Sequence, residues 1–120
     1  MLKAESHLKK SADFDRVYQK GQYLTHRLLV MKSLPNGLAY TRWGIVASKK
    51  LGPAVVRNRI KRRLREILRH ANLKPGTDIV IIARPGIAQA AFSETQMAAL
   101  ELLNKGGLKE QNETNSSAAD

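Results

Sequence analysis

Residues 51–76 read LGPAVVRNRIKRRLREILRHANLKPG, a segment in which apolar and basic side chains recur with the period of an α-helix. Pro53 suits a first helical turn, and Lys74-Pro75-Gly76 supplies residues that stop a helix. We therefore predict one long helix here with an apolar stripe along one side. The stripe consists of Val56, Ile60, Leu64, Ile67 and Ala71, with Leu68 at its edge.

The polar side of this predicted helix carries most of the chain's positive charge. Residues 49–69 hold nine Lys or Arg and a single acid, Glu66, so they contribute +8 to a net charge of +11. Their mutual repulsion opposes the compact state unless an external polyanion neutralises it, and each phosphate contacted releases counterions that favour binding. The polar face comprises Asn58, Arg62, Arg65 and Arg69, flanked by Arg59 and Lys61.

Three interpretations of this basic face compete. A face solvated only by water normally mixes charges of both signs. A helix lying on a membrane surface normally places Trp or Phe on its apolar side, whereas this stripe is aliphatic. The pattern therefore favours a nucleic acid, because planar guanidinium groups make bidentate contacts to phosphates.

The length and composition of the chain limit its organisation and compartment. A chain of 120 residues, 42% of them apolar, fits a single domain, which we place at residues 1–107, followed by a flexible polar tail at 108–120. There is no cysteine, no apolar signal segment at the N-terminus and no run near the ~20 apolar residues that span a bilayer. We expect a cytoplasmic protein without membrane contact.

A first helix is predicted from Ser11, which can cap it, to Gly21, which can end it. Phe14, Val17 and Tyr18 share one face of that helix. Core packing is the ordinary role of such a face.

Strands are predicted on both sides of the basic helix. Residues 26–34 form one strand, and the Asn-Gly pair at 36–37 predicts a tight hairpin to a second strand within 38–48. The pattern at 22–25 does not decide whether a further short strand forms there. The unbroken apolar run at 79–83 predicts a strand covered on both faces beside a parallel neighbour, which makes strand, basic helix and strand a crossover unit.

The last helix is predicted from a capping box. Ser93 would accept from the Gln96 amide while Gln96 reaches back, and Phe92 with Met97 would form the matching hydrophobic staple. The apolar pattern then continues to Gly106.

The side chains that independent catalysis would need are missing from the sequence. The acids are few and dispersed, and His7, His26 and His70 lack the spacing of metal ligands, so we predict neither catalytic residues nor a metal site on this chain. A helix that is basic throughout, set among strands, favours recognition of backbone and shape in structured RNA over base reading by an all-helical DNA regulator. A structural protein of another ribonucleoprotein and a DNA-binding regulator are the alternatives.

The run SKKLGPAVVRNRIKRRLRE at residues 48–66 closely resembles the signature of the bacterial ribonuclease P protein subunit. That pattern has Ser-x-Lys-Lys, a Gly, Ala-Val, then Arg-Asn-Arg-x-Lys-Arg and a trailing Arg-Glu. The resemblance extends to DFDRVYQKG at 13–21, WGIVASKK at 43–50 and DIVIIAR at 78–84, and it covers roughly residues 8–104.

The resemblance implies a fold and an activity. The fold would be α+β, a two-layer α/β sandwich in which a mixed sheet packs with helices in the order α-β-β-(β)-α-β-α, with an unusual left-handed crossover through the basic helix. The function would be that of the accessory subunit of a ribonucleoprotein. Its catalytic RNA, one per protein, removes the 5′ leader from precursor transfer RNA by hydrolysis with Mg²⁺ that is bound mainly by the RNA.

The resemblance also implies roles for individual residues. Phe14, Val17 and Tyr18 would line a cleft for the single-stranded leader, with Tyr18 standing where Phe is common in the family. Arg57-Asn58-Arg59 would lie near the catalytic centre of the RNA. Together with the remaining basic positions and the polar face of the helix, the implied RNA-binding set is Lys49, Lys50, Arg57, Asn58, Arg59, Lys61, Arg62, Arg65 and Arg69.

Overall fold

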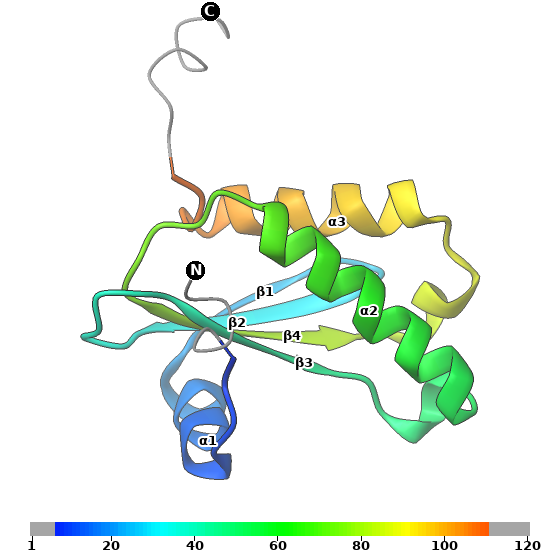
Figure 1. Cartoon of the computed structure of the whole chain (residues 1–120), viewed down its shortest axis with the longest axis horizontal. Coiled ribbons are helices and arrows are strands. Elements are labelled where there is room, and N and C mark those ends of the chain that lie inside the picture. Colours follow the sequence, from blue (N-terminus) through cyan, green and yellow to red (C-terminus); the bar gives the residue numbers. More distant parts are fainter. Residues whose placement is uncertain (1–6, 111–120) are drawn as a thin grey trace, which may run out of the picture.

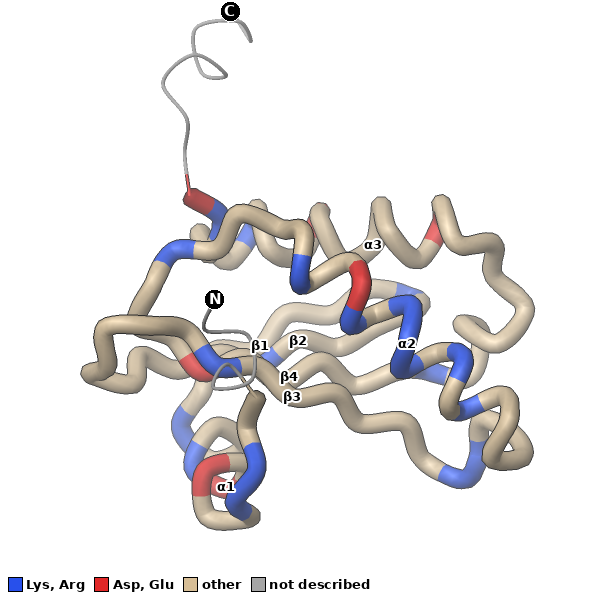
Figure 2. Tube along the Cα trace, viewed as in Figure 1, with Lys and Arg blue, Asp and Glu red and all other residues tan. Residues whose placement is uncertain are grey.

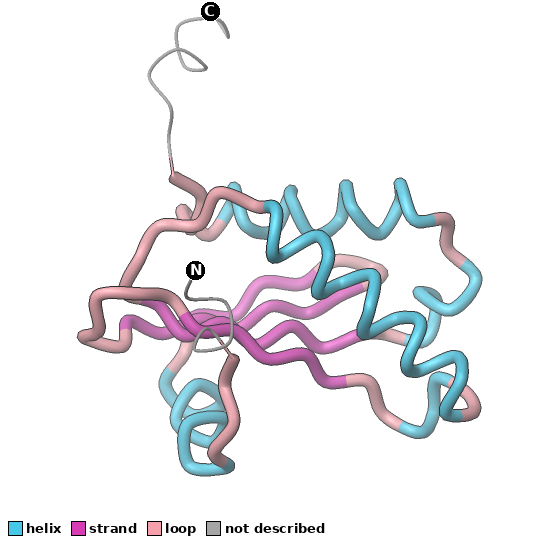
Figure 3. The backbone as a smooth tube through the Cα atoms, in the orientation of Figure 1, coloured by secondary structure: helices cyan, strands magenta, loops and turns pink. Residues whose placement is uncertain are grey.

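The structure, a computed structural model, describes residues 7–110 and contains three helices and one four-stranded sheet within them (Figures 1 and 3). Two short 3-10 turns, η2 (Lys49–Leu51) and η3 (Pro85–Gln89), complete the regular structure. The main elements in chain order are α1 (Ser11–Lys20), β1 (Gln22–Thr25), β2 (Leu29–Pro35), β3 (Arg42–Val46), α2 (Ala54–His70), β4 (Thr77–Ala83) and α3 (Phe92–Lys105).

The sheet is mixed and has the strand order β1-β2-β4-β3. β2 pairs with β1 and β4 in antiparallel fashion, whereas β3 and β4 are parallel and are joined through α2. α2 and α3 cover one face of the sheet, and α1 lies against the other face (Figure 1). This arrangement confirms the predicted α+β fold and the crossover unit, and the undecided segment at 22–25 is a strand.

The predicted hairpin between β2 and β3 is wrong, because β4 is inserted between them. Gly37 does have a positive φ of 72°, but Asn36 uses its side chain to build the turn instead of adopting a left-handed backbone. Its Oδ1 accepts from the amide of Leu38 at 2.7 Å, and its Nδ2 donates to the carbonyl of Tyr40 at 3.2 Å. A local turn signal cannot show that a strand from later in the chain enters between its neighbours.

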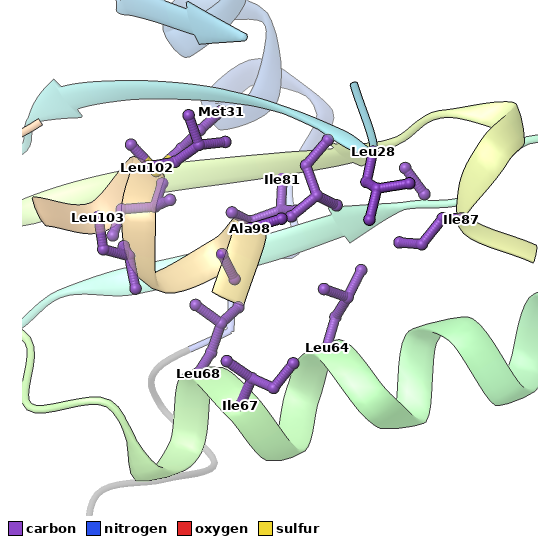
Figure 4. Close-up of a cluster of buried hydrophobic side chains, with 14 of the residues drawn as sticks. Leu28, Met31, Leu64, Ile67, Leu68, Ile81, Ile87, Ala98, Leu102 and Leu103 are labelled. Carbon is purple, nitrogen blue, oxygen red and sulfur yellow. The ribbon is translucent and has the colours of Figure 1, made fainter. Parts of the chain in front are cut away.

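The core lies between the sheet and the two helices α2 and α3 (Figure 4). Alternate residues of β2 and β4 point into it, as the pairings of Leu29 with Ala83 and of Met31 with Ile81 show. From the predicted stripe of α2, Ile60, Leu64 and Ile67 are buried there and Val56 and Ala71 are half-buried. Leu68, predicted at the edge of the stripe, is also fully in the core, so α2 presents a broad apolar side to the sheet.

The helix ends differ from the predictions in detail. Pro53 precedes α2 as its N-cap residue, and the helix ends at His70, before the Lys-Pro-Gly stop. α1 is preceded by Lys10, so Ser11 is its first residue and not its cap. Gly21 ends α1 as predicted, with its amide donating to the carbonyl of Val17 at 2.8 Å.

The predicted capping box of α3 is shifted toward the N-terminus. Glu94 reaches back to the backbone amide of Ala91 at 2.9 Å, so Ala91 occupies the cap position assigned to Ser93. Met97 is 70% exposed, and with the cap at Ala91 it no longer occupies the position of a staple residue. In a capping box the side chain three residues after the cap accepts from the cap residue's own amide, and Glu94 makes this half of the motif for Ala91.

The structure also differs at the start of the predicted tail. Leu108 is buried, and Lys109 forms a β-bridge with Leu73. The carbonyl of Leu108 accepts from the amide of Lys74 at 2.8 Å, so residues 108–110 belong to the domain. The remainder of the predicted tail, residues 111–120, lies outside the described part of the chain.

Candidate nucleic-acid interface

The exposed side of α2 carries a row of three arginines preceded by an asparagine, which we call the basic ridge: Asn58, Arg62, Arg65 and Arg69, all exposed. Figure 2 shows Lys and Arg positions following α2 along its length, while few acidic positions interrupt them. Lys61, Arg57 and Arg59 flank the ridge and are half-buried, and Lys49 and Lys50 are exposed in η2 just before the helix. The structure therefore places all nine RNA-binding residues of the sequence analysis on one continuous segment, with the ridge facing away from the core.

Internal carboxylates leave most of the ridge uncompensated. Among the residues described, the acid that pairs with a basic side chain of α2 is Glu66, which contacts Arg69 and lies 3.5 Å from His70. The hydrogen bond from Arg69 lowers the pKa of Glu66, with the positive charges of Arg69 and His70 acting in the same direction and desolvation opposing them. One exposed acid cannot neutralise the row, so the ridge is available to an external polyanion.

The half-buried arginines beside the ridge are held by backbone carbonyls. Arg57 donates to the carbonyl of Gly52 at 3.2 Å, and Arg59 donates to the carbonyl of Ala88 at 3.3 Å. The Nε atom of Arg59 is buried without a partner in the structure. These contacts fix the direction of the guanidinium groups without cancelling their charge.

The aromatic face of α1 lies on the other side of the sheet. Val17 is fully buried against Leu8 and Val80, so it is a core residue. Phe14 is half-buried, and Tyr18 is 37% exposed, with their ring centroids 6.4 Å apart. The three residues thus share a face as predicted, but a ligand could reach only Phe14 and Tyr18.

Strand pairing extends this aromatic face with residues that sequence reasoning missed. Tyr23 of β1 pairs with Lys32 of β2, and Tyr23 is 58% exposed. The ammonium of Lys32 lies 5.2 Å from the ring centroid of Tyr18 and 5.4 Å from that of Tyr23. We call Phe14, Tyr18, Tyr23 and Lys32 the aromatic cleft. It combines exposed rings with a positive charge. Proteins that bind single-stranded nucleic acid use this combination to stack on bases and to contact phosphates.

The floor beside the aromatic cleft is apolar. Val30, Ile82 and Val46 are neighbours across three strands, and all three are half-buried. They belong to the sheet face that packs against α1, since the alternation of the strands places them with Val80. The helix α1 therefore covers this row of the sheet only in part.

A cavity of about 300 Å³ connects the two surfaces across the edge strand β3. Phe14 lines it from α1, Gly44 from β3, and Lys61 and Arg65 from α2. A Cβ atom added to Gly44 would lie 2.5 Å from Cζ of Phe14, so glycine makes room for the ring at this edge. The aromatic cleft and the basic ridge therefore approach each other at this edge of the sheet.

A buried ion cluster, also missed in the sequence analysis, fixes α1 to the sheet. Asp78 is fully buried and accepts from Arg42 at 2.7 and 2.9 Å, from Arg16 at 3.0 Å and from Asn36 at 2.9 Å. Asp13 of α1 accepts from the same Arg42 at 3.3 Å. Burial alone would raise the pKa of Asp78. The hydrogen bonds from Arg42, Asn36 and Arg16, together with the positive charge of Arg42, outweigh burial and lower it.

This cluster divides the basic residues into two groups. Arg42 and Arg16 are engaged with the buried Asp78 and are structural. Within residues 7–110, Arg62 and Arg65 of the ridge have no such carboxylate partner, and Arg69 pairs with the exposed Glu66. Net charge counts both groups alike, so composition could not separate them. The signal available in the sequence was Asp78, an acid at the start of an otherwise apolar strand, which requires a buried partner.

Within residues 7–110, no group of three or more His, Asp or Glu side chains gathers in a way that could hold a metal ion. Within the same range, none of the helices combines the length and apolar character needed to cross a membrane.

Comparisons with known proteins agree on one family. A family model described as Ribonuclease P matches residues 2–106. The ribonuclease P protein component of Caldanaerobacter subterraneus subsp. tengcongensis is 44% identical over 108 residues, which make up 88% of this chain and 93% of that protein. The corresponding protein of Dehalococcoides mccartyi is 42% identical over 120 residues, covering 99% of this chain and 100% of that protein.

Solved structures of such proteins share the fold. The ribonuclease P protein of Staphylococcus aureus superposes with a TM-score of 0.80 at 33% identity, covering 88% of this chain and 98% of that one. The protein of Thermotoga maritima gives a TM-score of 0.76 at 32% identity, covering 82% of this chain and 96% of that one. With a family model matched over nearly all of the described residues and relatives this similar, the chain belongs to the ribonuclease P protein family.

Proposed function

We propose that this chain binds the catalytic RNA of ribonuclease P through the basic ridge and the 5′ leader of precursor transfer RNA through the aromatic cleft. Membership of the family gives the chain a role in ribonuclease P and implies the ribonuclease P RNA as its partner. The observation that carries the proposal is the ridge itself. It is a row of exposed arginines on a helix whose other side is anchored in the core.

The ridge acts by neutralising phosphates where the RNA subunit and the substrate meet. α2 is 17 residues long, so it spans about 25 Å at ~1.5 Å per residue and can reach several phosphates. Its buried side keeps the helix rigid, so little conformational entropy is lost when the arginines bind. The ridge also strengthens the binding of the precursor to the RNA subunit, because its positive field lowers the repulsion between these two polyanions.

The aromatic cleft recognises the unpaired leader. Stacking on Tyr18 and Phe14 tolerates any base, because every base has a π-face, and Lys32 can contact the backbone beside them. Mature transfer RNA lacks the leader and cannot make these contacts. The cleft thereby favours precursor over product.

Hydrolysis of the phosphodiester bond is assigned to the RNA subunit and its Mg²⁺. This ion prefers near-octahedral oxygen coordination and often uses phosphate oxygens as ligands. The chain's contribution is to hold RNA phosphates close together. We further propose one protein per RNA and action in the cytoplasm.

Cleavage assays with and without the cognate RNA test the proposal. We expect leader removal to require the RNA at every magnesium concentration, and the protein to lower the magnesium concentration that is needed. Cleavage by the protein alone would contradict the assignment of catalysis to the RNA. Binding of the RNA without any effect on cleavage would favour the alternative, a structural protein of another ribonucleoprotein.

A further inference from the structure

A cavity lies at the C-terminal end of the basic ridge, and the function proposed above assigns it no role of its own. It measures about 640 Å³, which falls within the ~300–1,000 Å³ of small-ligand sites. Trp43 and His7 line one wall, Tyr40 contributes from the β2–β3 loop, and Arg65 and Arg69 line the wall formed by α2. We call this cavity the Trp43 pocket.

The walls of the Trp43 pocket combine aromatic rings with positive charge. The rings of His7 and Trp43 meet edge to face with centroids 4.6 Å apart, so the two side chains hold each other in place. No Asp or Glu lines the pocket. Burial, followed by the positive charges of Arg65 and Lys9, lowers the pKa of His7, as expected for an electropositive site.

The pocket is continuous with the ridge and lies across β3 from the aromatic cleft. Three of its residues, His7, Trp43 and Arg65, also line the cavity at the sheet edge that reaches Phe14. Arg65 and Arg69 belong to both ridge and pocket, so an RNA strand on the ridge has its backbone at the mouth of the pocket. Trp43 points to the α2 and α3 side of the sheet, whereas its neighbour Gly44 faces α1. A leader lying in the aromatic cleft is therefore on the opposite face.

We propose that the Trp43 pocket binds one unpaired nucleotide of the RNA subunit, with the base beside Trp43 and the flanking phosphates on Arg65 and Arg69. Splayed bases of RNA typically stack on aromatic side chains and on arginine. The pocket offers both: Trp43 itself is buried, whereas the rings of Tyr40 and His7 are half-buried, and Arg65 and Arg69 are exposed. Asn72, which also lines it, supplies an amide for the edge of the base. This inference rests on the proposed function. It adds a site for a base to a ridge whose other proposed contacts are with the RNA phosphates.

The position of Trp43 makes the site directly observable, because it is the sole tryptophan of the chain. We would follow its indole N–H signal by NMR in the full chain during titration with adenosine or uridine 5′-monophosphate. Inorganic phosphate and ribose 5-phosphate at equal ionic strength serve as controls. We expect a saturable shift with the nucleotides in the millimolar range and none with the two controls. An equal shift with phosphate would overturn the proposal, because it would show an anion site only.

Two variants separate the pocket from the charge of the ridge. Ala39→Leu adds apolar volume to an exposed lining residue and leaves every charge in place. Arg62→Ala removes a ridge charge outside the pocket lining. We expect Ala39→Leu to weaken nucleotide binding by about fivefold or more, the loss that corresponds to the lower end of base stacking, and Arg62→Ala to leave the indole response unchanged. The reverse pattern would overturn the proposal. Arg69→Ala, whose ion pair is exposed, provides a second variant if Ala39→Leu does not fold.

Titration with whole RNAs distinguishes this inference from the proposed function. We expect the ribonuclease P RNA to shift the Trp43 signal and a leader oligonucleotide to leave it unchanged. The RNA subunit could instead bind with a steep salt dependence, leave the Trp43 signal in place and have the same affinity for Ala39→Leu as for the wild type. That result would show that the pocket is not a base site, while the proposed function would stand. A response to the leader alone would also overturn the inference. Failure of the RNA subunit to bind at all would contradict the proposed function.

Discussion

At the scale of single residues, Asp78 is the acid on which the position of α1 depends. Replacing it by Asn leaves Arg42 and Arg16 without their common carboxylate, and breaking a buried pair in this way costs ~3–5 kcal/mol. We expect Asp78→Asn to lower the free energy of unfolding by about that amount, measured by urea unfolding. Asp15→Asn is the matched control, since it removes an equal charge at an exposed position of α1. It should change the free energy of unfolding by less than ~0.5 kcal/mol.

The same carboxylate predicts how stability depends on pH. The pKa of Asp78 is lower in the folded chain than in the unfolded one, so its contribution is complete above the unfolded value of about 3.9 and is lost as the pH falls toward the folded value. We expect the urea midpoint of the wild type to fall more steeply below about pH 4 than that of Asp78→Asn. Parallel profiles for the two proteins would show that Asp78 does not carry this dependence.

Tyr18 is the residue with which the leader contact is best tested. Its ring is partly exposed, so truncation affects the ligand more than the core. We expect Tyr18→Ala to weaken binding of precursor transfer RNA by about fivefold or more, at ~1–3 kcal/mol per stacked base, and to leave binding of mature transfer RNA unchanged. Tyr18→Phe keeps the ring and should retain the preference for precursor. Equal losses for both substrates in Tyr18→Ala would argue against a leader contact.

At the scale of elements, the packing of α1 on β3 depends on a glycine. A Cβ at position 44 would meet both Cζ and Cε1 of Phe14, at 2.5 and 2.8 Å, so the ring or the helix must move. We expect Gly44→Ala to lower the free energy of unfolding by ~1–3 kcal/mol and to reduce the preference for precursor, because the cleft is displaced.

A matched glycine and a compensating change test this packing. At Gly86 an added Cβ meets Cδ2 of Leu28 at an ordinary 3.6 Å, so Gly86→Ala should be close to neutral. The double variant Gly44→Ala, Phe14→Leu replaces the ring by a smaller side chain and should recover part of the lost stability. If Gly44→Ala is as stable as the wild type, the contact between α1 and β3 is looser than the structure indicates.

At the scale of the whole molecule, the ridge should make assembly strongly dependent on salt. If about six phosphates are contacted, affinity for the RNA subunit falls on the order of 10³-fold between 50 and 200 mM salt. Arg62→Ala should reduce the slope of log affinity against log salt by about one, measured by filter binding at several salt concentrations. Lys105→Ala is the control, because that lysine lies on α3 in an ion pair with Glu101 at 3.3 Å. A flat salt response would contradict backbone recognition.

The sequence by itself determined the basic helix and its two faces. The period of 3.6 is a local property, so the burial of Ile60, Leu64 and Ile67 and the exposure of Arg62 and Arg65 follow from spacing alone. The apolar run of β4 likewise indicated a strand covered on both faces. The family signature added the expectation of a cleft on α1, and the left-handed crossover it implies stays a prediction.

Only the tertiary structure decided the features that depend on pairing between distant segments. The insertion of β4 between β2 and β3 removed the predicted hairpin, and it placed Asp78 beside Arg42, 36 residues away along the chain. The register of β1 on β2 brought Tyr23 next to Lys32 and so enlarged the cleft. These contacts are set by which strands bury their apolar faces together. The pattern of residues within any one segment does not contain that information.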